Sequence, residues 1–134
     1  MSQIRVIYHR SLENILTEDE LSSLKADFAS YKGSSEIPDT FGRDALYNHP
    51  HSLPVVLNEE LAHIHLADDE TNWPEDRQQY QCTSDKHLVY CQGYNDRNCY
   101  LLMAILAPDA HDKANDNSIM HNLGKMAEKF RNQY

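Results

Sequence analysis

The sequence lacks long hydrophobic runs, and this absence excludes a membrane-spanning protein. No window of its 134 residues approaches the run of about 20 apolar residues that a transmembrane helix requires. The first ten residues, MSQIRVIYHR, lack the basic region and the apolar core of a signal peptide. The chain has the length of one typical domain. We therefore expect one cytoplasmic domain that covers residues 1–134.

Cysteine is also scarce. The three cysteines, Cys82, Cys91 and Cys99, are an odd number and show no C-x-x-C spacing. A disulfide framework and a thiolate zinc site are therefore not expected. Because Cys91 and Cys99 lie in apolar segments with no neighbouring base, we expect buried, reduced thiols rather than nucleophiles.

An excess of positive charge is absent as well. The sequence has 12 lysines and arginines against 21 acidic residues, a formal net charge of -9. Affinity for phosphates comes mainly from clustered lysine and arginine, so this balance argues against a free-standing, non-specific nucleic-acid binder. Acidic residues crowd the middle of the chain, whereas the C-terminal segment carries Lys125, Lys129 and Arg131. We expect a local basic surface there.

The strongest catalytic motifs are missing too. The sequence contains no phosphate-binding glycine loop, no G-x-S-x-G and no H-E-x-x-H. It has no internal repeat. What it does contain is histidine, with eight residues, two of them in the stretch LAHIHLADD at residues 61–69. Any chemistry must therefore be sought first among the histidines.

Two helices are predicted from capping signals and apolar spacing. The stretch TEDE at residues 17–20 has the form of a capping box, in which a hydroxyl and a carboxylate satisfy the first free N–H groups of a helix. It predicts a helix from about Glu18 to Lys32, with Gly33 as its left-handed end. A last helix has N-cap candidates at residues 115–118, and its apolar face comprises Ile119, Leu123, Met126 and Phe130.

Four strands are predicted from alternating or continuous apolar residues. The first covers residues 3–10, and the second covers residues 61–67. The segments HLVYCQG (His87 to Gly93) and CYLLMAILA (Cys99 to Ala107) form the other two, joined by the turn GYNDRN. The last strand is apolar on both faces, so we expect it in the interior of the sheet.

The segment from Gly33 to Pro54 is rich in turn-forming residues. We expect an ordered loop there that carries function or a partner contact, in which Arg43 to Tyr47 could form one short helical turn. A disordered segment is the alternative. The order of elements is then strand, helix, loop, three strands and helix. This order predicts an α+β domain with a small, mainly antiparallel sheet and flanking helices.

The two histidines of LAHIHLADD lie on one face of the predicted second strand, because side chains alternate along a strand. His63 and His65 could hold a divalent metal if a third ligand such as His111 joined them. They could also act in acid-base chemistry, since imidazole titrates near neutral pH. Cleavage of RNA through its 2′-hydroxyl needs a base, an acid and a cation. The available groups are His63, His65, His111, Arg43 and Lys125.

Plain structural roles stay open for the same side chains. Each histidine could be an ordinary hydrogen-bonded residue. Tyr47 could stack on an unpaired RNA base or simply pack in the sheet. The last helix carries Lys125, Lys129 and Arg131 opposite its apolar face, which is the arrangement of a solvated helix surface.

Six segments, in order along the chain, resemble the YafO family of bacterial toxins. They are ADFASYK (Ala26 to Lys32), IPDTFGRDALY (Ile37 to Tyr47), AHIHLA (Ala62 to Ala67), HLVYCQG (His87 to Gly93), LLMAILAP (Leu101 to Pro108) and MHNLGKMAEKFR (Met120 to Arg131). The resemblance implies the toxin of a type II toxin-antitoxin pair. Such a toxin is an mRNA interferase that acts on translating ribosomes, and a small protein antitoxin neutralises it. The wider resemblance is to RelE/ParE toxins, with a small sheet and helices packed on one side.

The resemblance also suggests roles for individual residues. It implies catalytic roles for His63 or His65 as general base and His111 as general acid, with Arg43 and Lys125 stabilising the phosphorane. RNA or ribosome contacts are expected at His87, Tyr47, Lys129 and Arg131. No metal and no cofactor are expected, and the partners are the antitoxin, mRNA and the ribosome, in particular its large subunit. The alternatives are a toxin that blocks the ribosome without cutting RNA, and a small metal-binding protein that uses His63 and His65.

Overall fold

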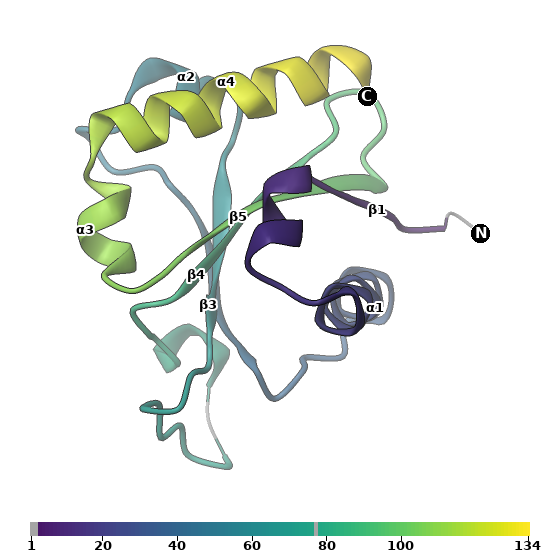
Figure 1. The fold of residues 1–134 in the computed structure, drawn as a ribbon, viewed down its shortest axis with the longest axis vertical. Helices are drawn as coiled ribbons and strands as arrows, with labels where there is room; N and C mark the ends of the chain where they lie inside the picture. Colours follow the sequence, from purple (N-terminus) through teal and green to yellow (C-terminus); the bar gives the residue numbers. More distant parts are fainter. Residues whose placement is uncertain (1–2, 77) are drawn as a thin grey trace.

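The computed structural model describes residues 3–76 and 78–134, and a five-stranded sheet lies at the centre of this part of the chain (Figure 1). The strands are β1 (Arg5–Tyr8), β2 (Phe41–Leu46), β3 (Ala62–Leu66), β4 (His87–Gln92) and β5 (Cys99–Leu106). Their order across the sheet is β1-β5-β4-β3-β2. The β1 and β5 pair is parallel, and the other neighbouring pairs are antiparallel. The predicted α+β class is confirmed, and the closer likeness to RelE/ParE toxins stays a prediction.

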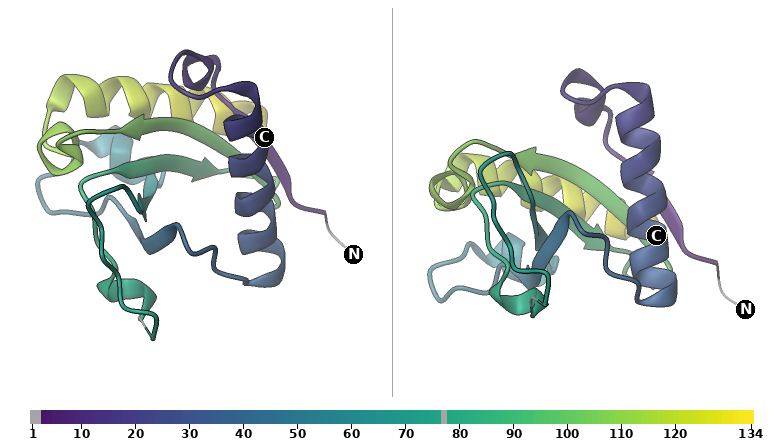
Figure 2. Two further views of the ribbon diagram at one scale, coloured as in Figure 1. Left: turned by 60° about the horizontal axis from the view of Figure 1, so that its bottom comes forward. Right: turned by 90° about the horizontal axis from the view of Figure 1, so that it is seen from below.

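Helices pack against both faces of the sheet, so the expectation of helices on one side alone is wrong. One face carries α1 (Glu18–Ser34) and the 3-10 turn η1 (Arg10–Asn14), and the other carries α2 (Pro54–Asn58) and α4 (Asn117–Gln133). The two long helices α1 and α4 run crosswise to each other (Figure 2). A short helix α3 (Ala110–Ala114) connects β5 to α4, and a 3-10 turn η2 (Gln79–Gln81) lies between β3 and β4.

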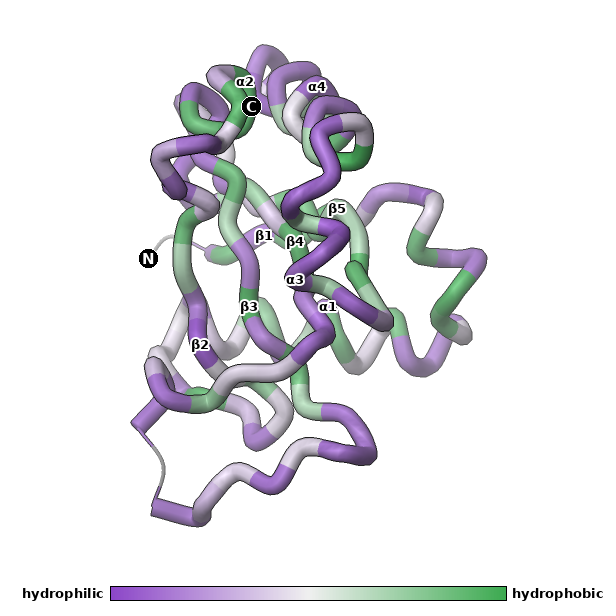
Figure 3. Tube along the Cα trace, turned by 90° about the vertical axis from the view of Figure 1, so that its left-hand side faces the viewer, coloured by the Kyte–Doolittle hydropathy of each residue, from purple (hydrophilic) through white to green (hydrophobic). Residues whose placement is uncertain are grey.

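Each face of the sheet has its own hydrophobic core, and the alternation of side chains along β3 and β4 supplies both. Ile64 and Leu88 pack with Phe28 of α1, whereas Val89 packs with Leu123 of α4 on the opposite face. Hydrophobic segments are concentrated in the central strands, while the connection from β3 to β4 is largely hydrophilic (Figure 3). Burial on both faces explains why β4 and β5 are apolar along most of their length.

The capping box at the start of α1 forms as predicted. Thr17 Oγ1 accepts a hydrogen bond of 3.1 Å from the Glu20 amide, and Glu20 Oε1 accepts one of 2.9 Å from the Thr17 amide. The predicted end at Gly33 is wrong by two residues. The helix continues to Ser34, and Ser35 takes the left-handed conformation with φ of 63°.

The predicted loop between Gly33 and Pro54 is wrong in its middle. The predicted helical turn at Arg43 to Tyr47 falls largely within β2, which pairs with β3 at one edge of the sheet. Asp44 in this strand points towards α1 and accepts hydrogen bonds from Tyr31 and Tyr90 at 2.7 and 2.5 Å. These partners are distant in the sequence, so the strand owes its position to tertiary contacts rather than to an apolar pattern.

The other predicted elements are confirmed with small shifts. The strands β1, β3, β4 and β5 lie inside their predicted ranges, and β5 is an interior strand between β1 and β4. Asp116 is the N-cap of α4, where its carboxylate accepts hydrogen bonds from the Ser118 and Ile119 amides. All three cysteines are free and buried, as predicted. No helix in the described part of the chain is long and apolar enough to cross a membrane.

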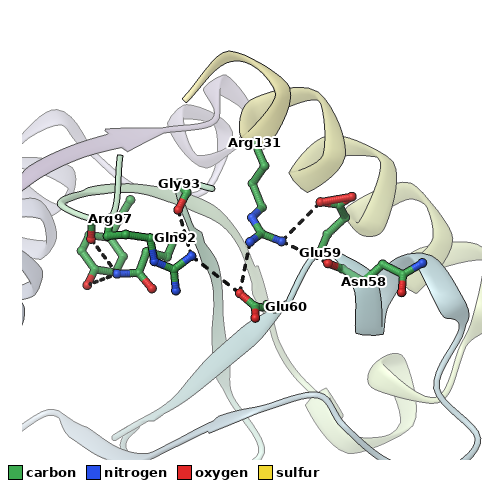
Figure 4. A network of polar contacts seen from close by, with 8 residues as sticks. Asn58, Glu59, Glu60, Gln92, Gly93, Arg97 and Arg131 are labelled. Carbon is green, nitrogen blue, oxygen red and sulfur yellow. Dashed lines mark hydrogen bonds and ion pairs between the residues drawn. The ribbon is translucent and has the colours of Figure 1, made fainter. Parts of the chain in front are cut away.

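Arg131 contradicts the expectation of a solvated surface on α4. Its side chain is 4% exposed and lies 3.3 Å from a carboxylate oxygen of Glu59 and 3.1 Å from one of Glu60 (Figure 4). It also donates to the Asn58 carbonyl. Arg97 approaches Glu60 from the other side at 3.7 Å. The guanidinium thus ties the end of α2 to α4, while Lys125 and Lys129 are exposed as expected.

Candidate active site

Three histidines come together on the face of the sheet that carries α2 and α4. His63 and His65 lie two residues apart on β3 and therefore share a face. His87 is paired directly with His65 across the antiparallel β3 and β4 ladder, so its side chain points the same way. We call His63, His65 and His87 the imidazole cluster.

The members of the imidazole cluster are close and buried. Their ring centroids lie 4.3 Å apart for His65 and His87, 4.6 Å for His63 and His87, and 5.3 Å for His63 and His65. The residues are 9%, 8% and 5% exposed for His63, His65 and His87. Such an arrangement of polar rings needs partners, because an unsatisfied buried polar group is costly.

Tyr47 contacts two members of the imidazole cluster. It follows β2, whose Ala45 pairs with His63, so it returns to the same face of the sheet. Its ring stacks on His63 with centroids 4.0 Å apart and planes 15° from parallel. Its hydroxyl lies 3.0 Å from Nδ1 of His87. The expected role of Tyr47 in binding RNA stays a prediction, and its position beside the cluster is the structural finding.

His65 is held by the backbone of Ser84. The Ser84 amide donates to Nδ1 of His65 at 2.8 Å, and the Ser84 carbonyl oxygen lies 3.0 Å from the same nitrogen. Nδ1 can accept from the amide when it is unprotonated, or donate to the carbonyl when it carries the proton. The ring therefore has a backbone partner in either tautomer. In contrast, Nδ1 of His63 is buried with no hydrogen-bond partner among the described residues.

A pocket of about 860 Å³ opens over the imidazole cluster. Arg43 and Tyr47 line it from the β2 side, and the segment around α3 and the start of α4 lines the opposite side. His111, exposed on α3, is part of this lining. The pocket is therefore built from segments that lie far apart in the sequence. The predicted residues that it brings together are Arg43, Tyr47, His63, His65, His87 and His111.

Arg43 is positioned by the connection between β3 and β4. Its Nε donates to the Tyr80 carbonyl oxygen at 2.6 Å, and its guanidinium lies 4.0 Å from the centroid of the Tyr80 ring. Arg43 also lines the pocket. A guanidinium held in this way suits a phosphate, which it can bind through two parallel hydrogen bonds.

Burial sets the protonation of the imidazole cluster. Burial and then the neighbouring rings of His87 and His65 lower the pKa of His63 to about 3. Burial and then His65 lower the pKa of His87 to about 4. Burial also lowers the pKa of His65, and Arg43 adds to this effect. All three rings are therefore neutral at pH 7 and each retains a lone pair.

The basic residues of α4 do not join the pocket. Lys125 is exposed and pairs with Glu128 at 2.6 Å on the same helix. Lys129 is exposed one turn further along. Arg131 is buried in the ion pairs with Glu59 and Glu60. Arg43 is the one lysine or arginine among the described residues that line the pocket. It is therefore the remaining candidate for stabilising the phosphorane, a role that the sequence predicted for both Arg43 and Lys125.

Sequence reasoning missed two features of the site. The first is the pairing of His65 with His87. It can be deduced only when the register of the antiparallel strands β3 and β4 is known. The second is Ser84, which acts through its backbone and so leaves no signal in side-chain chemistry. Chemically, the site offers neutral imidazoles as proton acceptors and a guanidinium for an anion.

Comparison with known proteins identifies the family of this chain. The family described as "Toxin YafO, type II toxin-antitoxin system" matches residues 29–132. The chain belongs to the YafO toxin family. A relative from Escherichia coli (strain K12), named mRNA interferase toxin YafO, is 46% identical over 132 residues, which cover 98% of this chain and 100% of the relative. No solved structure gives a significant match. The pocket and the imidazole cluster lie within the residues matched to the YafO family.

Proposed function

We propose that this YafO-family toxin is a ribosome-dependent mRNA interferase that cleaves mRNA in the pocket above the imidazole cluster. The observation that carries the proposal is the convergence of His65, His111 and Arg43 on one pocket. A base, an acid and a cation are the three groups that cleavage through a ribose 2′-hydroxyl requires. The Escherichia coli relative is named as an mRNA interferase toxin, which supports the same activity.

In the proposed reaction, a neutral imidazole takes the proton of the 2′-hydroxyl, and the 2′-oxygen attacks the adjacent phosphorus. The P–O5′ bond breaks as a second group gives a proton to the leaving 5′-oxygen. The products are a 2′,3′-cyclic phosphate and a 5′-hydroxyl end. The equatorial oxygens of the phosphorane carry the negative charge that a fixed guanidinium stabilises.

His65 is our general base, because its Nδ1–H can donate to the Ser84 carbonyl oxygen, and in this tautomer the other nitrogen keeps its lone pair for the substrate. His63 is less suited, since Tyr47 covers one face of its ring. His111 is our general acid, as it is exposed at the opposite side of the pocket. Arg43 is the phosphate ligand. Lys125 and Lys129, which lie outside the pocket, are assigned to ribosome contacts instead.

The charge of the protein supports dependence on the ribosome. A formal net charge of -9 disfavours capture of free RNA, so the ribosome would have to present the message. The place of action is then the cytoplasm, where messages are translated. The partner that restrains the toxin is a cognate protein antitoxin, as in other type II pairs.

The test is mRNA cleavage in a reconstituted translation system, read as new 5′ ends on a defined message. We expect His65→Gln, His111→Gln and Arg43→Gln each to lower the cleavage rate by about 100-fold or more, the usual range for acid-base groups. His121→Gln and His49→Gln are matched controls, one at an exposed position of α4 and one at the pocket rim, and should remain near the parent rate. Omitting ribosomes should abolish cleavage.

Other outcomes would contradict the proposal in distinct ways. Translation arrest without any new 5′ ends would show a toxin that binds the ribosome and does not cut. Full cleavage by both His65→Gln and His111→Gln would remove these residues from the mechanism. Cleavage of free mRNA at an equal rate would remove the requirement for the ribosome.

A further inference from the structure

The imidazole cluster has a property that acid-base cleavage does not require. Three buried imidazoles each offer one nitrogen, and these three nitrogens lie within 4.8 Å of one another. Acid-base cleavage through a 2′-hydroxyl needs one base and one acid, and His111 can supply the acid from outside the cluster. Within the cluster, two rings are therefore left without a chemical role.

We propose that His63, His65 and His87 form a binding site for a zinc ion. Three protein ligands with a fourth position open to a pocket are the usual arrangement of an accessible zinc site, and imidazole nitrogen is a preferred zinc ligand. The pocket above the cluster provides the open position. The three cysteines contribute no ligand to this group.

The spacing is compatible with zinc after a small closure. Zinc binds imidazole nitrogens at about 2.0 to 2.1 Å, so two nitrogens on a tetrahedral ion lie about 3.3 Å apart. The widest nitrogen pair in the cluster, at 4.8 Å or less, would have to close by about 1.5 Å or less. Rotation of the rings about their side-chain bonds can supply this movement.

The surroundings provide the second layer of contacts that metal-bound histidines need. A zinc-bound imidazole donates its other N–H group to a nearby acceptor, which fixes the ring. The Ser84 carbonyl oxygen is placed to accept from Nδ1 of His65, and the Tyr47 hydroxyl oxygen is placed to accept from Nδ1 of His87. His63 differs, because its buried Nδ1 has no partner among the described residues. A metal bond would satisfy a nitrogen of this kind.

The nearby charges are mixed. Arg43 opposes additional positive charge beside His63 and His65, whereas Asp85 favours it beside His87. The zinc-bound form could not use His65 as a proton acceptor, but the binding itself does not depend on the proposed RNA cleavage.

The test uses untagged, chelator-treated toxin and zinc ion alone, with bound metal measured by equilibrium dialysis and atomic emission. We expect about one zinc per chain, and cobalt(II) in its place should give the intense visible absorption of a tetrahedral ion. His87→Gln and His65→Gln should weaken binding by at least about tenfold. The controls His49→Gln and His51→Gln alter exposed histidines of the same pocket and should bind as the parent does.

A second measurement covers the case in which a cluster variant fails to fold. X-ray absorption at the zinc edge of the parent protein should show three imidazole nitrogens around the metal. Two or fewer imidazoles, binding that disappears in the His49→Gln and His51→Gln double variant, or no binding above background would overturn the proposal. An unchanged affinity in folded His87→Gln would overturn it too. None of these results depends on whether the toxin cleaves mRNA.

Discussion

The phenol ring of Tyr47 stacks on the imidazole of His63 while its hydroxyl lies 3.0 Å from Nδ1 of His87. One side chain from the end of β2 thus covers one histidine and contacts a second on another strand. Because β2 lies at the edge of the sheet, this contact connects the sheet edge to the site. Tyr47 is therefore a positioning residue for the imidazole cluster.

Replacement of Tyr47 separates the two contacts. Tyr47→Phe keeps the stacked ring and removes the hydrogen bond, so we expect a loss of about 1 kcal/mol in the free energy of unfolding. Tyr47→Ala removes both contacts and should cost about 3 kcal/mol. Urea denaturation measures both values. Mass spectrometry after histidine-specific modification should show faster labelling of His63 in Tyr47→Ala alone, and equal labelling in the two variants would contradict the covering role.

The pH dependence of stability follows from the lowered pKa values of the imidazole cluster. Below about pH 6.5 the unfolded chain protonates its histidines, whereas His63, with its pKa lowered to about 3, stays neutral in the folded protein. The unfolded state then binds more protons, so the free energy of unfolding falls as the pH drops. We expect His63 to account for a loss of at most about 2 kcal/mol between pH 7 and pH 5.

Urea denaturation in the presence of a chelator, at a series of pH values, measures this dependence. His63→Gln should reduce the slope between pH 7 and pH 5. His121→Gln removes an exposed histidine of α4 and should leave the slope as it is. Equal slopes for the parent and His63→Gln would contradict the neutral, buried state of His63.

Arg131 is expected to be critical for stability rather than for RNA binding. Arg131→Met leaves the carboxylate of Glu59, 18% exposed, without its partner and should destabilise the fold by about 3 kcal/mol. Lys129→Met, on the exposed side of the same helix, should change stability by about 0.5 kcal/mol or less. Thermal and urea unfolding compare the two variants. A near-neutral Arg131→Met would show that the ion pairs in Figure 4 contribute little.

Gly124 of α4 lies close to Val55 of α2. A Cβ added at this position would lie 2.5 Å from Cγ1 of Val55, which is too close for two carbon atoms that are not bonded to each other. Gly124→Ala should therefore lose about 1 to 3 kcal/mol by overpacking, although alanine favours helix formation by about 1 kcal/mol. Val55→Ala in the same chain should recover part of the loss. Failure of this rescue in urea denaturation would place the strain elsewhere.

Local patterns in the sequence were sufficient for several elements. The capping box at residues 17–20 and the alternation in AHIHL predicted the start of α1 and the two faces of β3 correctly. Both signals depend on residues a few positions apart. In contrast, β2 has the sequence FGRDAL, and its buried side includes Asp44, whose partners Tyr31 and Tyr90 come from α1 and β4. No local pattern carries that information.

The site, like the fold, could be predicted from the sequence only where the signal was local. Alternation placed His63 and His65 on one face, which is correct. Adding His87 required the register of β3 against β4, and placing Tyr47 required knowledge of β2. Arg131 was misplaced because its carboxylate partners follow α2, a helix too short to be evident from periodicity. Long-range pairing therefore decides which of the candidate residues meet.

The parallel pairing of β1 with β5 has a consequence for the synthesis of this toxin. Residues near the start of the chain find their strand partner only after residues 99–102 have been made, and the Asn95 and Asp96 amides donate to the backbone oxygen of Tyr134. The start of α4, which also lines the pocket, is made late as well. A ribosome that is still translating this message therefore carries a nascent chain whose pocket is incomplete.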